Sequence, residues 1–235
     1  MTETLALPGR ILFLSADAGS MKRQMAGETL SPAEAGVLRD DISTDEITPL
    51  PSLVCFDARL GEHAHTGTRA GDGCPIGVRA LKAGGFSVLV AGKRYGKGSS
   101  REHSPVAEKA AGIRLVIAES FERIYRQNCD NIGLFTSTDI SLVERIRAGE
   151  AIALDDLLKD RDAIAAAVLR AGGLLGYGQQ KLRHLSPAPA LPVPRGPQTL
   201  FEKIVARHTV ATPDSAARLS PGEGGFLRAD IRFIH

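Results

Sequence analysis

The pattern of apolar and polar positions predicts a parallel α/β core in the middle of the chain. Four short apolar runs have the length of buried strands, at residues 10–14, 86–91, 115–118 and 134–136. A segment with helical character separates the second run from the third, and another separates the third from the fourth. This alternation of strand and helix is typical of a parallel sheet covered by helices.

The same pattern predicts where several helices begin and end. Proline is tolerated in the first turn of a helix but not deeper, so Pro105 places the start of one helix at about Glu102. Gly112 is the expected end of that helix. Further helices are predicted at residues 121–128, 142–148 and 164–171, the last two followed by glycine.

The region from Asp40 to Asp72 lacks clear periodicity. It is rich in Asp, Pro, Gly and His, and only residues 53–56 resemble a core segment, so irregular loops are expected. Loops of this length usually line a site or a partner surface. Selection of a ligand by shape is therefore expected in residues 49–71.

The end of the chain predicts a linker followed by a second, small unit. Five prolines within residues 185–198 favour an extended interdomain linker and exclude a helix there. Thr199 and Glu202 form a capping-box pattern that opens an amphipathic helix, and residues 229–234 are expected to form a strand. We expect a main domain at residues 1–184, the linker at 185–198, and the incomplete beginning of a second region at 199–235.

Composition narrows the class of protein. With 29 Lys and Arg against 27 Asp and Glu, the net charge of +2 provides no basic field for a nucleic acid, and 5% aromatic residues provide few platforms for base stacking. No apolar stretch approaches the ~20 residues of a membrane-spanning helix, and the N-terminus lacks a signal-peptide core, so a cytoplasmic protein is expected. The three cysteines are widely separated, so no metal site is expected in this chain alone.

The strongest chemical signal lies in residues 92–103, with the sequence GKRYGKGSSREH, between a predicted strand and a predicted helix. Gly96 and Gly98 permit positive φ angles and close approach of a ligand, and the backbone N–H groups at the following helix start favour an anion. Arg101 supplies a two-pronged donor for a carboxylate. Ser99 supplies a hydroxyl whose alkoxide the same donors would stabilise, so the turn predicts an anion clamp beside a base.

Other interpretations of this turn remain open. Ser99 and Glu102 also fit a capping box, in which Ser99 would only cap a helix, although the position of Pro105 argues against it. The patterns of a P-loop and of a dinucleotide-binding turn are both absent. Arg94 and Lys97 are basic and near the turn, but a place on the solvated surface is at least as compatible with the sequence as a role in the site.

Three spaced blocks of sequence resemble the swivel domain of the aconitase superfamily. They are DISTDEITP at residues 41–49, GKGSSREH at 96–103 and IAESFERIYRQNCDNIGL at 117–134. The likeness is strongest to the small subunits of 3-isopropylmalate dehydratases, enzymes of leucine biosynthesis. It implies a swivelling β/β/α domain of α/β class that closes over a 4Fe–4S cluster held by a large subunit or a C-terminal catalytic region. Residues 199–235 look like the opening of such a region.

The resemblance also implies roles for individual residues. Ser99 matches the family's catalytic serine, which as an alkoxide removes a proton from a substrate carbon. Ser100 and Arg101 match residues that bind substrate carboxylate, and Asp45 is expected to support the site. Lys97 stands between two glycines where isopropylmalate dehydratases usually carry Cys, a departure that bears on the substrate.

The expected function is that of a hydro-lyase that isomerises a hydroxy di- or tricarboxylate by dehydration and rehydration. The resemblance implies that iron acts as a Lewis acid on the substrate hydroxyl. Isopropylmalate, citrate, homocitrate and methylcitrate are all compatible with it. The alternatives are a noncatalytic anion-binding or regulatory module with the same fold, or a nucleotide-binding domain that uses the glycine-rich turn.

Three further residues have simple expected roles. Cys129 is expected to be a buried structural thiol. His63 and His65 alternate in a loop, where solvation is a better interpretation than a shared metal. His103 at the predicted helix start could tune the site electrostatically or have no role.

Overall fold

The computed structural model describes residues 3–55, 57–98, 101–183, 197–210, 219 and 224–229. The chain divides into two compact units, Met1–Leu175 and Gly176–His235. Almost all of the predicted linker at residues 185–198 lies outside the described residues. Of the predicted strand at residues 229–234, only Ala229 is described.

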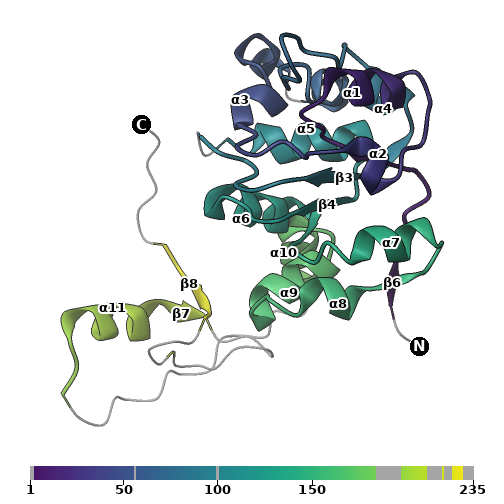
Figure 1. Cartoon of the computed structure of the whole chain (residues 1–235). Coiled ribbons are helices and arrows are strands. Elements are labelled where there is room, and N and C mark those ends of the chain that lie inside the picture. Colours follow the sequence, from purple (N-terminus) through teal and green to yellow (C-terminus); the bar gives the residue numbers. More distant parts are fainter. Residues whose placement is uncertain are drawn as a thin grey trace. The chain divides into compact units, whose positions relative to one another are not determined.

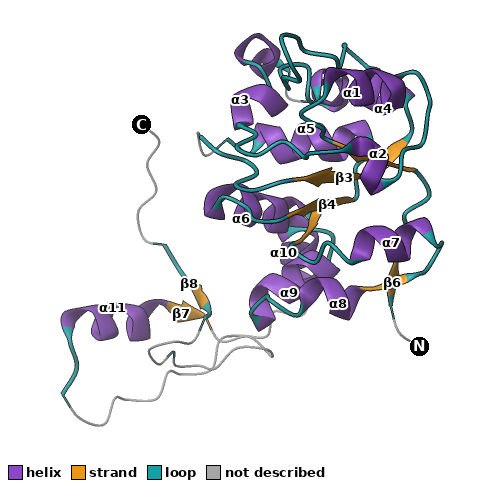
Figure 2. Cartoon of the chain, in the orientation of Figure 1, coloured by secondary structure: helices purple, strands orange, loops and turns teal. Residues whose placement is uncertain are grey.

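From Phe86 to Leu158 the elements of the first unit alternate between strands and helices (Figures 1 and 2). Its strands are β1 (Thr4–Leu5), β2 (Arg10–Phe13), β3 (Phe86–Ala91), β4 (Leu115–Ala118), β5 (Phe135–Ser137) and β6 (Ile152–Ala153). Its α-helices are α1 (Ala18–Met25), α2 (Pro32–Ala35), α3 (Thr44–Ile47), α4 (Ala80–Ala83), α5 (His103–Ala111), α6 (Arg123–Ile132), α7 (Leu142–Arg147), α8 (Leu154–Leu158) and α9 (Ala163–Arg170). Two 3-10 helices, η1 (Leu50–Val54) and η2 (Ala58–His63), lie between α3 and α4.

A four-stranded parallel sheet in the order β2-β3-β4-β5 forms the centre of this unit. Side chains alternate between its two faces, so that Leu89 and Val116 belong to one buried cluster while Val90 and Ile117 belong to the other. Parallel strands that are buried on both faces require helices on both sides. The predicted α/β class with a parallel sheet is confirmed.

The two buried clusters show which helices cover which face of the sheet. Side chains of α1, α3, α4, α5 and α6 contribute to the first cluster. Those of α2, α7, α8 and α9 contribute to the second, together with β6, which pairs with β1 in a small antiparallel sheet. The unit is therefore a three-layer α/β/α arrangement.

The strands and helix ends agree closely with the sequence predictions. Strands β3 and β4 have the predicted bounds, and Glu102 is the N-cap of α5, which ends at Gly112 with a φ of 106°. Helix α6 begins two residues later than predicted and extends to Ile132, because the left-handed Gly133 ends it. The region from Asp40 to Asp72 is more ordered than predicted, since it contains α3, η1 and η2.

The second unit contains most of α10 (Leu174–Arg183), which begins at the end of the first unit, and α11 (Leu200–His208). The predicted capping box is confirmed, because Thr199 accepts from the backbone N–H of Glu202 and the Glu202 side chain accepts from that of Thr199. Strands β7 (Thr209–Val210) and β8 (Phe226–Leu227) pair antiparallel. The rings of Tyr177 and Phe226 stack with centroids 5.7 Å apart. Within the described part of the chain, no helix has the length and apolarity needed to cross a membrane.

At the β2 edge of the sheet, a buried glutamine forms hydrogen bonds with the backbone. β2 is an edge strand, and the Gln24 side chain of α1 forms two hydrogen bonds with the backbone of Phe13. The Phe13 N–H donates to Gln24 Oε1 at 2.8 Å, and Gln24 Nε2 donates to the Phe13 carbonyl at 2.9 Å. Because Gln24 is fully buried, these bonds satisfy edge groups that water does not reach.

The Gln24→Leu substitution should destabilise the protein, because it keeps the side-chain size but leaves the buried Phe13 N–H unpaired. We expect a loss of about 1–3 kcal/mol in the free energy of unfolding, measured by urea denaturation. The matched control is Gln127→Leu at an exposed position of α6, which should change stability by less than about 0.5 kcal/mol. Equal effects of the two substitutions would contradict this account of the edge.

Candidate functional site

The glycine-rich turn follows β3 at the carboxyl edge of the parallel sheet. On one side it is joined to the segment after β4, since the Tyr95 N–H donates to the Ser120 carbonyl at 3.0 Å and the Glu122 N–H donates to the Tyr95 carbonyl at 2.9 Å. On the other side the N–H groups of Gly96 and Lys97 both donate to the Ile42 carbonyl. All three sequence blocks that carry the family resemblance therefore meet at this turn.

Gly96 and Gly98 have the positive φ angles that the sequence predicts, 81° and 112°. A Cβ at Gly96 would lie 2.1 Å from Cγ of Tyr125, so the turn rests directly on this ring of α6. A Cβ at Gly98 would lie 3.3 Å from Oγ1 of Thr44. Gly96 lets the backbone approach Tyr125 more closely than a side chain would allow, while the contact at Gly98 is only tight.

Arg101 and Asp45, two of the predicted site residues, form an ion pair. Nη1 of Arg101 donates to Oδ1 of Asp45 across 56 positions of sequence. The Arg101 side chain is 24% exposed and that of Asp45 is 60% exposed, so Arg101 is mostly sheltered while the carboxylate meets solvent. Ser99 and Ser100 lie outside the described residues, and their predicted roles stay predictions.

The position of Asp45 follows from local capping of α3. Ser43 accepts from the backbone N–H of Glu46, and the Glu46 side chain accepts from that of Ser43. This capping box places Asp45 in the first turn of a short helix. Arg39 also pairs with Glu46 at 3.0 Å, which ties the helix to the preceding loop.

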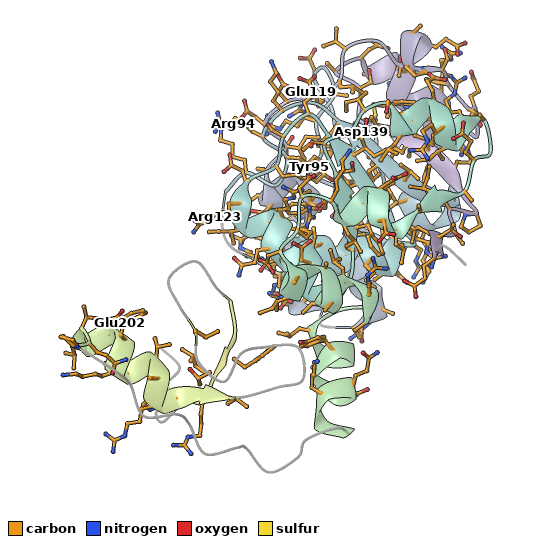
Figure 3. All side chains as sticks on the ribbon, turned by 90° about the horizontal axis from the view of Figure 1, so that it is seen from below. Arg94, Tyr95, Glu119, Arg123, Asp139 and Glu202 are labelled. Atoms are coloured by element: carbon orange, nitrogen blue, oxygen red, sulfur yellow. The ribbon has the colours of Figure 1, made fainter. Side chains whose placement is uncertain are left out.

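Arg94 and Lys97 lie at the surface beside Asp41. Arg94 is 3.2 Å from Asp41 and 3.3 Å from Glu122, and Lys97 Nζ is 3.7 Å from Asp41. Both side chains are about half exposed. Figure 3 shows Arg94 and Arg123 at the outer surface and Tyr95 farther inside. The interpretation of Arg94 and Lys97 as part of a solvated, charged surface is consistent with these contacts.

Thr44 is a candidate site residue that sequence reasoning missed. Its side chain is buried, and its Oγ1 has no hydrogen-bond partner among the residues that the structure describes. The Thr44 N–H donates to the Lys97 carbonyl at 2.8 Å, which holds the hydroxyl against the turn at Gly98. A buried hydroxyl is normally satisfied, so this group is available to a neighbour or ligand at the turn. The position of Thr44 within the block at residues 41–49 is the sequence feature that could have indicated it.

A small cavity of about 170 Å³ lies at the start of α5. Among described residues its walls are Leu60, Glu102, His103 and Val106. The role of His103 in tuning the site stays a prediction.

Beneath the turn lies a buried polar cluster that includes His65, Tyr95, Glu108 and Tyr125, each no more than 2% exposed. The expectation that His65 belongs to a solvated loop is wrong. Its Nε2 is 3.0 Å from Glu108 Oε1, so the ring is buried against a carboxylate of α5. The sequence pattern around His65 resembles a polar loop, and only the packing of that loop on α5 buries it.

Burial changes the acid–base behaviour of three groups in this region. Burial, with the nearby Glu108 carboxylate, raises the pKa of the Tyr95 hydroxyl well above its ordinary value, and burial does the same for Tyr125. Burial also raises the pKa of the Cys129 thiol. Cys129 is fully buried, and its protonated thiol agrees with the predicted structural role.

Comparisons with known proteins support the family resemblance that the residues at this turn carry. Residues 62–138 match the family described as the Aconitase C-terminal domain. The 3-isopropylmalate dehydratase small subunit of Desulfovibrio desulfuricans is 35% identical over 158 residues, which cover 61% of this chain and 92% of that protein. The corresponding subunit of Pyrobaculum aerophilum is 35% identical over 156 residues, covering 60% of this chain and 92% of that protein.

A solved structure of 3-isopropylmalate dehydratase from Methanocaldococcus jannaschii is also similar. It is 31% identical, covers 62% of this chain and 91% of that chain, and has a TM-score of 0.46. The family assignment rests on the sequence relatives, two of which this chain covers almost completely. This chain belongs to the family of 3-isopropylmalate dehydratase small subunits, whose common domain is the aconitase C-terminal domain.

The Gly96→Ala substitution should disrupt the turn. The new methyl group would face both an unfavourable φ and the ring of Tyr125, so we expect a loss of about 2–4 kcal/mol in the free energy of unfolding. Gly149→Ala is the matched control, because Gly149 has a φ of 78° and nothing within 4 Å of its Cβ position. The control should lose only about 1–2 kcal/mol, and similar losses at both positions in denaturant titrations would contradict the close approach to Tyr125.

Stability should fall at alkaline pH because of Tyr95, Tyr125 and Cys129. Their pKa values are raised in the folded protein, so their contribution is complete below the unfolded values near 9 to 10 and is lost as the pH rises above them. Each group should add a slope of about 1.4 kcal/mol per pH unit above its unfolded pKa. Urea titrations from pH 8 to pH 11 measure this slope, and Tyr125→Phe should reduce it. A flat profile would show that these groups ionise freely in the folded state.

Proposed function

We propose that this chain is the substrate-binding part of an aconitase-type hydro-lyase that acts on a hydroxy di- or tricarboxylate. The observation that carries the proposal is the meeting of Arg101 with Asp45 at the carboxyl edge of a parallel sheet, in a chain of the 3-isopropylmalate dehydratase small-subunit family. Ligands of open α/β sheets bind at this edge. An arginine held there by a carboxylate suits recognition of an organic acid.

Each residue of this site has a proposed task. Arg101 binds a substrate carboxylate through its two-pronged guanidinium, and Asp45 orients that guanidinium from outside. Ser100 adds a donor to the same carboxylate. Ser99 accepts a proton from the carbon next to a carboxylate, a weakly acidic position, while the backbone and Arg101 stabilise the alkoxide.

The described residues do not fit an iron–sulfur cluster. Cys55 is half-buried, Cys74 is exposed and Cys129 is fully buried. Within the described ranges, no group of three or more His, Cys, Asp or Glu residues could hold a metal ion. We therefore propose that the 4Fe–4S cluster expected for this family belongs to a large aconitase-like subunit or to a catalytic region that follows this chain.

Two features support a site that a partner completes. The Asp45 side chain that pairs with Arg101 is 60% exposed, so the ion pair is open to solvent on its carboxylate side. In the second unit, α11 leaves Leu200 and Phe201 about three-quarters exposed. We propose that residues 1–184 form the swivel domain, that 185–198 link it onward, and that 199–235 begin the larger region.

The test combines this chain with the large subunit of the same organism after reconstitution with iron and sulfide. The wild-type complex should interconvert a hydroxy acid and its dehydrated product. Ser99→Ala should lower kcat by about 10²–10⁴-fold, the usual contribution of a general base. Arg101→Lys should raise KM by about tenfold or more through loss of the second hydrogen bond. The control Arg147→Lys, on the exposed part of α7, should change neither constant.

The results separate the proposal from its alternatives. Unchanged turnover in Ser99→Ala would show that Ser99 is not the general base. Protection of the chain against thermal unfolding by ATP or NAD, without protection by dicarboxylates, would instead indicate a nucleotide-binding domain. Carboxylate binding without turnover in the reconstituted complex would indicate a noncatalytic anion-binding module.

A further inference from the structure

The buried cluster beneath the turn joins four separate segments of the chain. His65 lies in the loop after η2, Tyr95 in the glycine-rich turn, Glu108 in α5 and Tyr125 in α6. Glu108 and His65 are fully buried. A buried glutamate is rare in proteins unless it is paired, so the contacts of Glu108 require an explanation.

Glu108 accepts hydrogen bonds at both carboxylate oxygens. The Tyr95 hydroxyl donates to Oε1, and the Tyr125 hydroxyl donates to Oε2. His65 Nε2 is 3.0 Å from the same Oε1, and its other ring nitrogen, Nδ1, is 2.8 Å from Thr68 Oγ1. Glu108 is therefore the common hydrogen-bond partner of three side chains that come from three other segments, and the Tyr95 hydroxyl also lies 3.0 Å from His65 Nε2.

One tautomer of His65 connects all of these groups. With the proton on Nε2, the ring donates to Glu108 and accepts from the Thr68 hydroxyl through Nδ1. In that arrangement the Glu108 side chain accepts from His65, Tyr95 and Tyr125, so the four residues form one hydrogen-bond network.

Two residues of this cluster, Tyr95 and His65, are connected through the backbone to the residues of the proposed site. Tyr95 precedes Gly96 and Lys97, whose N–H groups donate to the Ile42 carbonyl, and the chain continues from there to Ser99 and Arg101. The His65 N–H donates to the Ile47 carbonyl at 2.7 Å, at the end of α3, the helix that carries Asp45. Glu108 thus links, through one carboxylate, the segment of Arg101 to the segment of Asp45.

The backbone next to Tyr95 and at His65 has positive φ angles, which the surrounding structure must stabilise. Arg94, next to Tyr95, has a φ of 56°, and His65 has a φ of 63°. Residues other than glycine rarely adopt such angles unless the surrounding structure holds them. At His65 the backbone N–H and both ring nitrogens all have partners, and at Arg94 the N–H donates to Ser120 Oγ at 2.9 Å.

We propose that Glu108 is a positioning residue of the site, which holds the turn of Arg101 and the helix of Asp45 in register through Tyr95 and His65 and does not itself contact substrate. This inference rests on the proposed function for its effect on turnover, but not for its effect on the turn. A buried ion network often contributes little to stability, so a purely structural role does not by itself explain its presence.

The first test measures amide hydrogen exchange in the full chain and needs neither partner nor activity. Glu108→Gln offers one acceptor oxygen in place of two, and Tyr95→Phe removes only the hydroxyl that joins the turn to Glu108. In both variants the amides of Gly96 and Lys97 should exchange about tenfold faster or more, while those of Leu89 and Val116 in the sheet keep their rates. Glu144→Gln, an exposed glutamate of α7, is the matched control and should change none of them.

The second test measures the steady-state constants of the reconstituted complex. A displaced turn should lower kcat/KM by about 10–100-fold in Glu108→Gln, because Ser99 and Arg101, which follow the turn, lose their orientation toward the substrate. Tyr95→Phe should show a smaller change in the same direction. Glu144→Gln should match the wild type.

The two tests separate failure of this inference from failure of the proposed function. An inactive wild-type complex would overturn the function, while exchange at Gly96 and Lys97 would still decide the inference. Unchanged exchange at these amides in both variants would overturn the inference whatever the activity. Uniformly faster exchange across the sheet and the turn in both variants would also overturn it, since it would show a general loss of stability without local positioning.

Discussion

The backbone hydrogen bonds of Tyr95, Gly96 and Lys97 are the constraint on which the arrangement of the site depends. They hold the turn after β3 between the segment after β4 and the loop before α3. Neither neighbour is adjacent to the turn in sequence, and both are placed by the parallel sheet. Because Gly96 lies against the Tyr125 ring with no room for a Cβ, the turn has little freedom to shift. Arg101 and Asp45 meet as a consequence of this placement.

Two buried polar side chains join separate segments of the protein. Gln24 closes the edge of the sheet, and Glu108 gathers two tyrosines and a histidine beneath the turn. Burying an amide or a carboxylate is costly unless every hydrogen bond is made, and here the observed partners meet that requirement. Such groups penalise alternative packings, in which a donor or acceptor would lose its partner, so they favour one arrangement of the segments around the site.

Arg94 and Lys97, at the rim of the turn, are more exposed than Arg101, which is proposed to bind the ligand. Arg94 and Lys97 share Asp41 and are about half exposed, so their charges are offset and solvated. Arg101 is more sheltered, and among the described residues its one carboxylate partner, Asp45, is itself exposed. This contrast favours Arg101 as the donor to a substrate carboxylate. It also places Lys97, which departs from the usual cysteine of the family, at the rim beside Asp41.

Much of the central fold could be predicted from the sequence, because burial on both faces of a parallel sheet leaves continuous apolar runs and glycines mark the helix ends. Strands β3 and β4, the start of α5 at Glu102 and the capping box at Thr199 follow from such local signals. Helix α1 was not predicted, because its buried face includes Ser20 and Gln24 and so lacks an apolar stripe. Helices α2 and α3 lack a periodic signal because capping boxes, not apolar periodicity, define them.

The sequence by itself determined the class of the fold, the turn that carries the chemistry and the family resemblance. Only the tertiary structure decided that Arg101 pairs with Asp45, that Thr44 faces Gly98, and that His65 is buried against Glu108. The physical reason is the range of the interactions. Apolar periodicity, capping and turn chemistry act over a few residues and can be recognised along the chain. The contacts of the site join residues tens of positions apart, and they exist only once the order of the strands has brought those segments together.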